Sequence, residues 1–445
     1  MQPINTMPTK QPVDLLLFPR WVVPVVPSGV VLEDYALAVE KGRIAALLPA
    51  KEARRRFSAS QEEELKTHVL IPGLINLHCH AAMSLFRGMA DDLPLGTWLR
   101  EHIWPAEAKH VCARFVHDGT LLACAQMLRG GVTCFNDMYF FPEAAAQAVE
   151  AAGMRAALGL TVLEFPNAYA QGAEDCFAKG LEAYRSLRDR GRLSFCLAPH
   201  APYSVSNPSF QRAASLAKAL NLPLHTHLHE TREEIAQSLK EHGVRPLERL
   251  RRLGLLGPRL LAVHAVHLEA QEIAQLAACG ASVAHCPTSN LKHGSGIAPL
   301  AALLKAGVNV GLGTDGAASN SRFDMLEEMR LAALLAKGST EEAAAVDAHK
   351  ALEMATLAGA RALALEGEIG SLEAGKAADL CAVDLGGLHG LPCRNPVSQL
   401  VYGGSGADVT HLWVEGRAHL KEGHLLQLEA EALAALADKY PCQHA

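Results

Sequence analysis

Two histidines separated by one residue, His78 and His80, stand at the end of the apolar run IPGLINLHCH. Side chains two residues apart in a strand point to the same side, so both imidazoles would face one way and Cys79 the other. Two imidazoles with a shared direction make up half of a zinc site. The pair is equally compatible with two hydrogen-bonded histidines, so the pattern alone leaves both interpretations open.

Histidine and carboxylate side chains also end three later apolar runs. They are His225, His227, His229 and Glu230 in PLHTHLHE, His264 and His267 in VHAVHL, and Asp315 in GTDGAASN. A single histidine at a strand end is more often a hydrogen-bonded wall residue than a ligand. We therefore interpret His225 and His229 as packing or supporting residues, and we assign no role to His267 or His285.

The runs that carry these residues alternate with stretches rich in Ala and Leu, which is typical of repeated βα units. We place eight strands at residues 68–80, 131–137, 155–163, 193–200, 223–230, 260–268, 281–290 and 308–316. Most of them end in a polar cluster, and the strand ends of a (β/α)8 barrel converge on its active-site face. The predicted fold class is therefore α/β, a (β/α)8 barrel with its chemistry at one mouth.

Runs outside the barrel favour a second, smaller domain. DLLLF, WVVPVV and ALAVEKGRIAALLP near the start, and GSLEAGKAADLCAVDL and VTHLWVEGRAHLKEG near the end, indicate strands with turns. We expect residues 1–67 and 371–445 to form one small β-sandwich domain, and residues 68–370 to form the barrel.

Composition narrows the function classes. The 445 residues carry 47 acidic and 41 basic side chains, a net charge of -6, without a block of Lys and Arg that would follow a nucleic-acid backbone. Arg20 and several prolines interrupt the apolar N-terminal stretch, which argues against a membrane span or a signal peptide. Eleven cysteines without paired spacing favour reduced thiols. We expect a soluble, cytoplasmic protein that binds neither nucleic acid nor a membrane.

Four motifs, taken in chain order, resemble those of the amidohydrolase superfamily. They are H-C-H in PGLINLHCH, the pair His227-x-x-Glu230, His264 in VHAVHL and Asp315 in GTDGAASN. The resemblance covers essentially the whole chain, including the KGRIAALLP and LWVEGRAHLKEG pieces. It implies that one metal ion is held by four side chains, those of His78, His80, His227 and Asp315. We expect zinc, although Fe2+ and Mn2+ suit the same ligand types.

The resemblance also implies roles for the residues beside the metal. Glu230 would protonate a ring nitrogen and carry a proton to the departing ammonia, while His264 and Asp315 would orient or deprotonate the attacking water. Relatives with two metals carry a lysine near the end of the fourth strand, where this chain has Ala198, Pro199 and His200. The absence of that lysine favours the branch with one metal.

Zinc deaminases of the cytidine type use H-x-E and P-C-x-x-C ligands. The only P-C dipeptides of this sequence, Pro392-Cys393 and Pro441-Cys442, lack the second cysteine. That class is therefore excluded.

The segment AAMSLFRGMADDLPLGTWLREHIWPAEAKHV, after the first predicted strand, resembles the substrate loop of methylthioadenosine/S-adenosylhomocysteine deaminases. The resemblance implies that Trp98 packs against the base or the sugar, that Glu107 accepts hydrogen bonds from ribose hydroxyls, and that His200 faces the substrate. Without it, Trp98 and Glu107 would be read as the buried and solvated sides of an amphipathic helix.

Arg155 is the candidate partner for the carboxylate of S-adenosylhomocysteine, or else a structural ion-pair partner. The loop LEFPNAYAQGAEDCF provides no second arginine. This departure from the family favours methylthioadenosine, which has no carboxylate.

The resemblance implies a zinc-dependent hydrolase that deaminates 5'-methylthioadenosine to 5'-methylthioinosine, S-adenosylhomocysteine to S-inosylhomocysteine, or both. A deaminase of guanine, cytosine or an s-triazine, or a triazine chlorohydrolase, would keep the metal ligands and change only the loops. A noncatalytic scaffold on the same fold is a further alternative.

The sequence leaves three properties open: which nucleoside is preferred, which metal is native, and whether the chain forms a homo-oligomer. HCPTSNLKHGSGIAP resembles the family's seventh-strand loop, which implies that Ser289 and Asn290 support the site, but both residues are also ordinary loop formers and stay outside the predicted site.

Overall fold

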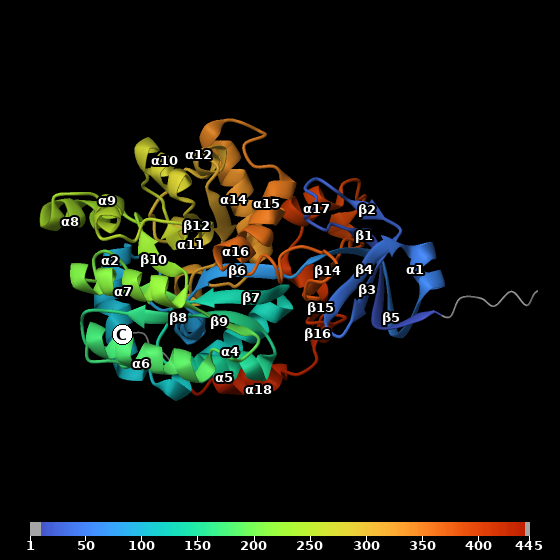
Figure 1. Cartoon of the computed structure of the whole chain (residues 1–445), viewed down its shortest axis with the longest axis horizontal. Helices are drawn as coiled ribbons and strands as arrows, with labels where there is room; N and C mark the ends of the chain where they lie inside the picture. Colours follow the sequence, from blue (N-terminus) through green and yellow to red (C-terminus); the bar gives the residue numbers. More distant parts are fainter. Residues whose placement is uncertain (1–9, 441–445) are drawn as a thin grey trace, which may run out of the picture.

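The computed structural model describes residues 10–440, which form two parts that lie side by side (Figure 1). One part is a barrel of eight parallel strands with helices around it. The other is a nine-stranded sheet to which both ends of the chain contribute, seen at the right of Figure 1 in blue and red. The predicted barrel and the union of the two chain ends in a small β domain are therefore confirmed.

The barrel strands follow one another in chain order, and each corresponds to one predicted strand. They are β6 (Leu74–Cys79), β7 (Val132–Asp137), β8 (Arg155–Val162), β9 (Leu193–Pro199), β10 (Leu224–Leu228), β11 (Leu260–His264), β12 (Ser282–His285) and β13 (Asn309–Leu312). Almost every residue in them is buried, as expected for a parallel sheet covered on both faces.

Contacts between the ends of β6 and β13 close the barrel. The Asn76 side chain donates to Thr314 Oγ1 (2.8 Å) and accepts from the Thr314 N–H (2.9 Å). The Asp315 N–H donates to the carbonyl of His78 at 2.9 Å. A Cβ at Gly313 would lie 2.7 Å from the backbone nitrogen of His78, so glycine permits this close approach. Closure thus brings the first and last predicted metal ligands together.

Helices follow the strands and cover the outside of the barrel. The principal ones are α4 (Ala113–Arg129), α5 (Pro142–Ala152), α6 (Ala173–Leu187), α7 (Asn207–Leu220), α8 (Arg232–His242), α9 (Pro246–Arg252), α10 (Ala270–Cys279), α12 (Leu300–Lys305), α14 (Met325–Thr340), α15 (Ala348–Met354) and α16 (Leu357–Ala362). Shorter helical segments lie in the loops after β6, β12 and β13: η1 (Ala81–Phe86), α2 (Leu95–Thr97), η2 (Trp98–Ile103), α3 (Trp104–His110), α11 (Pro287–Lys292) and α13 (Ala317–Asn320). The C-terminal helix α18 (Ala430–Ala437) packs against α4.

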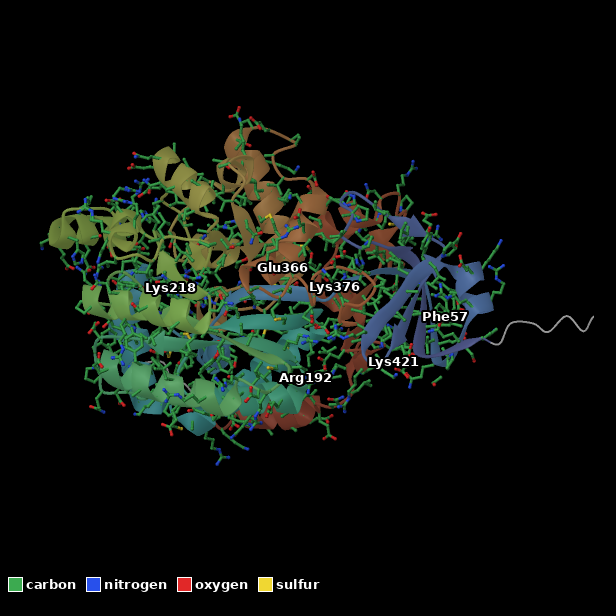
Figure 2. All side chains as sticks on the ribbon, in the orientation of Figure 1. Phe57, Arg192, Lys218, Glu366, Lys376 and Lys421 are labelled. Atoms are coloured by element: carbon green, nitrogen blue, oxygen red, sulfur yellow. The ribbon has the colours of Figure 1, made fainter. Side chains whose placement is uncertain are left out.

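The second sheet is continuous in its hydrogen bonding, with β14 from the C-terminal part paired to β5 from the N-terminal part. Its strands are β1 (Gln11–Val22), β2 (Leu32–Glu33), β3 (Tyr35–Glu40), β4 (Arg43–Pro49), β5 (Phe57–Pro72), β14 (Leu380–Asp384), β15 (Val409–Val414), β16 (Arg417–Lys421) and β17 (His424–Leu425), joined by α1 (Ala50–Arg56), η3 (Leu388–Gly390), α17 (Pro396–Tyr402) and η4 (Gly406–Asp408). Figure 2 shows Phe57 and Lys421, from opposite ends of the chain, on this part.

The predicted strand at residues 68–80 is wrong as a single element. Residues up to Pro72 belong to β5, where Val69 pairs with Val383, and the barrel strand begins only at Leu74. Gly73 makes the transition, since a Cβ there would lie 2.2 Å from Thr133 Oγ1. The first half of β5, FSASQEEELK, was not predicted because its charged residues hide the alternation of a strand. The domain limits at 67/68 and 370/371 stay a proposal.

Between residues 10 and 440, no helix is both long and apolar enough to cross a membrane. The ten cysteines within the same residues are all free. Cys442, of the second P-C dipeptide, lies outside the described part of the chain.

Candidate active site

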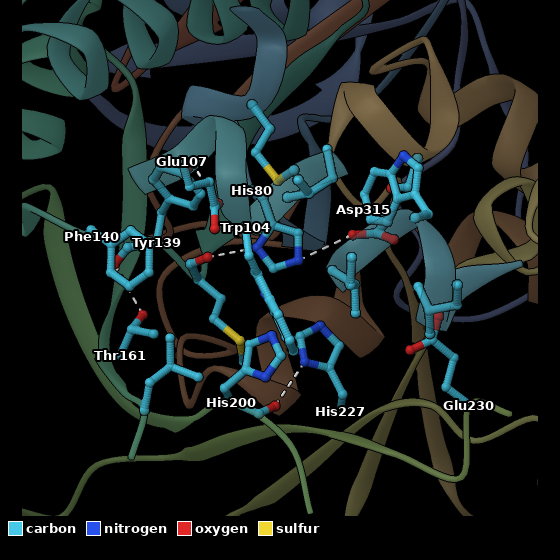
Figure 3. Close-up of a pocket in the computed structure, with 18 of the residues that line it drawn as sticks. His80, Trp104, Glu107, Tyr139, Phe140, Thr161, His200, His227, Glu230 and Asp315 are labelled. Atoms are coloured by element: carbon cyan, nitrogen blue, oxygen red, sulfur yellow. Dashed lines mark hydrogen bonds and ion pairs between the residues drawn. The ribbon is translucent and has the colours of Figure 1, made fainter. Parts of the chain in front are cut away.

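The carboxyl ends of β6, β10, β11 and β13 bring together the residues for which we predict metal binding and catalysis (Figure 3). They are His78, His80, His227, Glu230, His264 and Asp315. The ligand atoms of His78, His80 and Asp315 all lie within 4.8 Å of one another, and so do those of His78, His227 and His264. Side chains far apart in sequence therefore converge on one point, as the barrel geometry requires.

Hydrogen bonds fix the orientation of the imidazoles. His80 Nδ1 donates to the carbonyl of Met138 (2.6 Å), and His227 Nδ1 donates to the carbonyl of His200 (2.7 Å). His78 Nδ1 lies 2.9 Å from His225 Nε2. With Nδ1 engaged in this way, the Nε2 lone pair of each ring is left for a metal, the usual arrangement for ligating histidines.

The carboxylate of Asp315 completes this group. Its Oδ1 lies 3.3 Å from the Nε2 atoms of both His78 and His80. Ser289 Oγ donates to Oδ2 at 2.6 Å, and the Gly316 N–H donates to Oδ1 at 2.8 Å. Asp315 itself has a φ of 63°, in the left-handed region that residues other than glycine rarely adopt. This strained backbone conformation directs the carboxylate toward His78 and His80.

These side chains fit a divalent cation. His78 Nε2 is buried without any hydrogen-bond partner, although it faces a carboxylate. Burial lowers the pKa of His78 to about 4, so the ring is neutral and its lone pair is free. For His80, burial lowers the pKa, but the hydrogen bond and charge of Asp315 outweigh it and raise the pKa to about 9. The carboxylate of Asp315 thus favours a positive charge between itself and the two histidines. A metal ion would supply that charge in place of a proton.

Glu230 and His264 lie beside this group. Burial, followed by the negative charge of Asp315, raises the pKa of Glu230 to about 8, so its carboxyl group can carry a proton at neutral pH. His264 Nδ1 is 2.9 Å from Asn290 Oδ1 and donates to it, which leaves Nε2 as an acceptor 3.6 Å from Glu230 Oε2. One group can donate a proton and its neighbour can accept one.

A buried carboxylate, Glu234 at the start of α8, holds the turn that presents Glu230. Its two oxygens accept the backbone N–H groups of His229 (2.9 Å) and Glu230 (2.8 Å). His229 has a φ of 55°, and successive N–H groups in such a turn form a concavity that favours an anion. Glu234 is 4% exposed, so solvent competes little for these bonds. It acts on the reaction through the position of Glu230.

We expect Glu234→Gln to lower kcat by about 10- to 100-fold with little change in KM, because a carboxamide can accept only one of the two N–H bonds and Glu230 would move. Steady-state kinetics and metal analysis of the purified variant test this. Glu241→Gln, at an exposed position of the same helix, is the matched control and should behave as wild type. An equal loss in both variants, or a loss of metal in Glu234→Gln, would contradict the positioning role.

A cavity opens directly above the histidines and contains about 630 Å3 of empty space, part of it open to solvent. Three of the predicted substrate residues, Trp98, Glu107 and His200, line it together with His80, His227 and Glu230. Its lining combines apolar walls with a few polar groups that converge on one point, which is typical of a site for a small ligand. Trp98 lies in η2 with its ring 4.7 Å from that of His293, and it is largely buried.

Glu107 projects into this cavity from α3. Tyr139 donates its hydroxyl proton to Glu107 Oε1 at 2.8 Å, which leaves the other oxygen available to a ligand. Burial raises the pKa of Glu107 to about 7 despite that hydrogen bond. His200 Nδ1 is 2.7 Å from Ser204 Oγ, and its ring packs 4.8 Å from that of His227. Both residues are thus placed to contact a ligand that also reaches the histidine cluster.

The predicted substrate role of Arg155 is wrong. Its side chain lies at the start of β8, at the opposite end of the strand from the cavity, and donates to Asp379 (2.8 Å) and Glu415 (2.7 Å) of the small domain. Arginine stands there because Asp379 is buried and needs a cationic partner. The second of the two roles considered, a structural ion pair, is the correct one.

Replacing Arg155 by Leu should therefore destabilise the protein by about 3–5 kcal/mol, since the Asp379 carboxylate would stay buried without its partner. Urea denaturation measures this loss, with the half-exposed Arg188→Leu as the control. The kcat/KM of the folded variant should stay within about twofold of wild type. Unchanged stability with a selective loss of one substrate would restore the binding role.

Several supporting residues were not predicted. Ser289 and Asn290, for which a supporting role and a loop role were both open, stood outside the predicted site, and α11 directs them to Asp315 and His264. Tyr139 and Glu234 were not considered at all. The only sequence signal for Glu234 is its place one helical turn after Glu230, and nothing in the run FNDMYF distinguishes Tyr139 from a core aromatic residue.

The chain is similar to known proteins along nearly its whole length. The sequence pattern of the amidohydrolase family matches residues 69–419. A 5-methylthioadenosine/S-adenosylhomocysteine deaminase of Teredinibacter turnerae is 47% identical over 428 residues, which are 96% of this chain and 97% of that protein. A 5'-deoxyadenosine deaminase of Methanothermobacter thermautotrophicus is 43% identical, covering 83% of this chain and 86% of its own. The crystal structure of a zinc-bound adenosine deaminase from Xanthomonas campestris shares 46% identity with a TM-score of 0.96, covering 97% and 98% of the two chains.

Proposed function

Because this chain belongs to the amidohydrolase family, we propose that it is a metal-dependent hydrolase that deaminates 5'-substituted adenine nucleosides and releases ammonia. One observation carries the proposal. A single cavity is lined by His80, His227, Asp315 and Glu230 and also by Glu107, whose second oxygen is not engaged by Tyr139. A nucleoside has groups that match both parts of this lining, an amino-bearing ring carbon for Glu230 and the histidines and ribose hydroxyls for Glu107.

We propose that zinc occupies the group formed by His78, His80, His227 and Asp315. The orphaned Nε2 and the neutral ring of His78 support this assignment, and the zinc in the Xanthomonas structure agrees with it. When bound at such a site, zinc lowers the pKa of a coordinated water to about 7 and so provides a nucleophile at neutral pH. Iron or manganese would suit the same ligand types.

The residues beside the metal would move the protons. Glu230, protonated at neutral pH, would donate to the ring nitrogen next to the amino-bearing carbon, which makes that carbon more electrophilic. His264 Nε2, kept free by the Nδ1 bond to Asn290, would accept a proton from the attacking water together with Asp315. Glu230, now a carboxylate, would take the second water proton from the added hydroxyl group and pass it to the departing amino group, so that ammonia leaves and the carbonyl forms. The proton held by His264 and Asp315 would then return Glu230 to its protonated state.

The rest of the cavity would position the nucleoside. Glu107 Oε2 would accept a hydrogen bond from a ribose hydroxyl, with Tyr139 holding the other oxygen. His200 would contact the ribose or the ring, and Trp98 would give the base an apolar surface. A free base has no hydroxyls for Glu107 and would leave this partly buried carboxylate without a ligand partner.

A panel of ring systems tests the proposal. Metal-loaded protein is incubated with 5'-methylthioadenosine, adenosine, guanine, cytosine and an amino-s-triazine, and ammonia release is measured. We expect the two nucleosides to be deaminated and the other three compounds to be inert. Activity on a free base or the triazine alone would support the corresponding alternative, and inactivity on all five, with metal bound, would support the scaffold. The cytoplasmic location and oligomeric state stay predictions from the sequence.

A further inference from the structure

A second cleft lies outside the cavity that contains the histidine cluster. It holds about 950 Å3 of empty space, part of it open to solvent, and none of its lining residues lines the first cavity. Three segments of the barrel contribute to it: the residue that follows η1, the end of α4, and the loop from α13 to α14. The η4 turn, which precedes β15 of the small domain, contributes a further wall. The cleft thus lies where the two parts of the molecule meet.

The lining of this cleft is basic, whereas the whole chain has a net charge of -6. It contains Arg87, Arg129 and Arg322, and its only carboxylate is that of Asp324. The Asp324 side chain caps α14, where it accepts the first two N–H groups of the helix at 3.0 and 3.3 Å. It also accepts the N–H of Gly406 at 3.0 Å. Backbone donors therefore engage this carboxylate, and it forms no ion pair with the arginines.

Two of the three arginines have no carboxylate partner among residues 10–440. Arg87 donates to the side-chain oxygen of Gln126, which is neutral. Arg129 donates to two backbone carbonyls of the small domain, at 2.9 and 3.2 Å. Arg322 reaches one carboxylate, that of Glu327, at 3.4 Å. Neutral partners thus hold the guanidinium groups of Arg87 and Arg129 in place without offsetting their charge.

These contacts bring donors from three segments together. Gln126 and Arg129 are three residues apart on α4, so their side chains are neighbours on one face of the helix. Arg87, which is bonded to Gln126, therefore lies on the same face as Arg129. Ser321 also lines the cleft, and its Oγ accepts a hydrogen bond from Lys292 at 3.0 Å, which leaves the hydroxyl proton available to a ligand. Such a set of donors suits an anion with several oxygens.

We propose that this cleft binds a phosphate group. A phosphate offers several oxygens and close to two negative charges, and guanidinium groups match its geometry with paired N–H donors. The bound anion would link Arg87, at the end of the segment that follows His80, with Ser321, in the segment that follows Asp315. The ligand is inorganic phosphate or the phosphate of a small ester, and it binds outside the cavity proposed for the nucleoside.

Titration calorimetry of the metal-loaded protein with inorganic phosphate and, separately, with glycerol 3-phosphate tests the proposal. We expect one binding site per chain, with a dissociation constant of about 1 mM or lower. Arg87→Gln and Arg322→Gln each neutralise an exposed side chain, so the fold should persist, and the double variant should bind at least about tenfold more weakly. Tighter binding of the free ion or of the ester shows which form the site prefers, and either result supports the proposal.

The matched control is Arg330→Gln, since Arg330 is exposed on α14 and does not line the cleft. It should bind phosphate as the wild type does. The proposal is overturned if the wild-type protein shows no saturable binding, or if Arg330→Gln weakens binding as much as the double variant does. Binding that persists in the double variant and disappears when the metal is removed would place the anion on the metal ion, and would also overturn it.

Discussion

Glu230→Gln should lower kcat for 5'-methylthioadenosine by about 1000-fold while the protein keeps its metal, because glutamine preserves the shape of the side chain but has no carboxyl proton to donate. The pKa of Glu230, raised to about 8 by burial and by Asp315, is the property that suits it to this role. Steady-state kinetics and metal analysis of the same preparation measure both effects.

The matched control for this variant is Glu269→Gln, which neutralises a carboxylate that is exposed and remote from the cavity. It should retain wild-type activity. Turnover by Glu230→Gln within tenfold of wild type would remove Glu230 from the proton transfers, and a preparation without metal would instead make it a ligand.

His227→Ala should lose both the metal and the activity, with turnover at least about 1000-fold below wild type. The reason lies in the geometry, since His227 supplies one of the three Nε2 atoms and its Nδ1 is fixed by the carbonyl of His200. Removing it leaves too few ligands for tight binding of a zinc ion that prefers about four.

The metal content after dialysis, measured against wild type and against His242→Ala on α8, tests this prediction. His242→Ala should keep one metal ion per chain and full activity. If His227→Ala also binds one ion tightly and remains active, the ligand assignment is wrong and His264, which lies in the same cluster, would be the residue to examine as the fourth ligand.

The barrel could be predicted from the sequence because parallel strands buried on both faces are nearly continuous apolar runs. VTCFND and LSFCLAP need no knowledge of their neighbours to be recognised as strands. The charged half of β5, FSASQEEELK, has no such signal, and its strand structure comes from pairing with β1. The limits of the strands likewise depend on contacts such as that of Gly73 with Thr133.

The candidate site likewise has residues that the sequence could predict and residues that it could not. Spacing predicted His78 and His80 as a pair, because strand geometry alone sets the direction of their side chains. The resemblance to a family then supplied His227, Glu230 and Asp315. Contacts between distant segments could not be derived from the sequence. For this reason the role of Ser289 stayed open, those of Glu234 and Tyr139 were missed, and Arg155 was placed in the wrong part of the molecule.

The most direct test of hydrolytic deamination is to follow 5'-methylthioadenosine in water labelled with oxygen-18. Water that attacks the amino-bearing carbon leaves its oxygen there, so we expect 5'-methylthioinosine with one heavy oxygen and one ammonia per molecule of substrate. Mass spectrometry of the product and an ammonia assay read both quantities. Release of free adenine without ammonia, or a product without the heavy oxygen, would contradict the account.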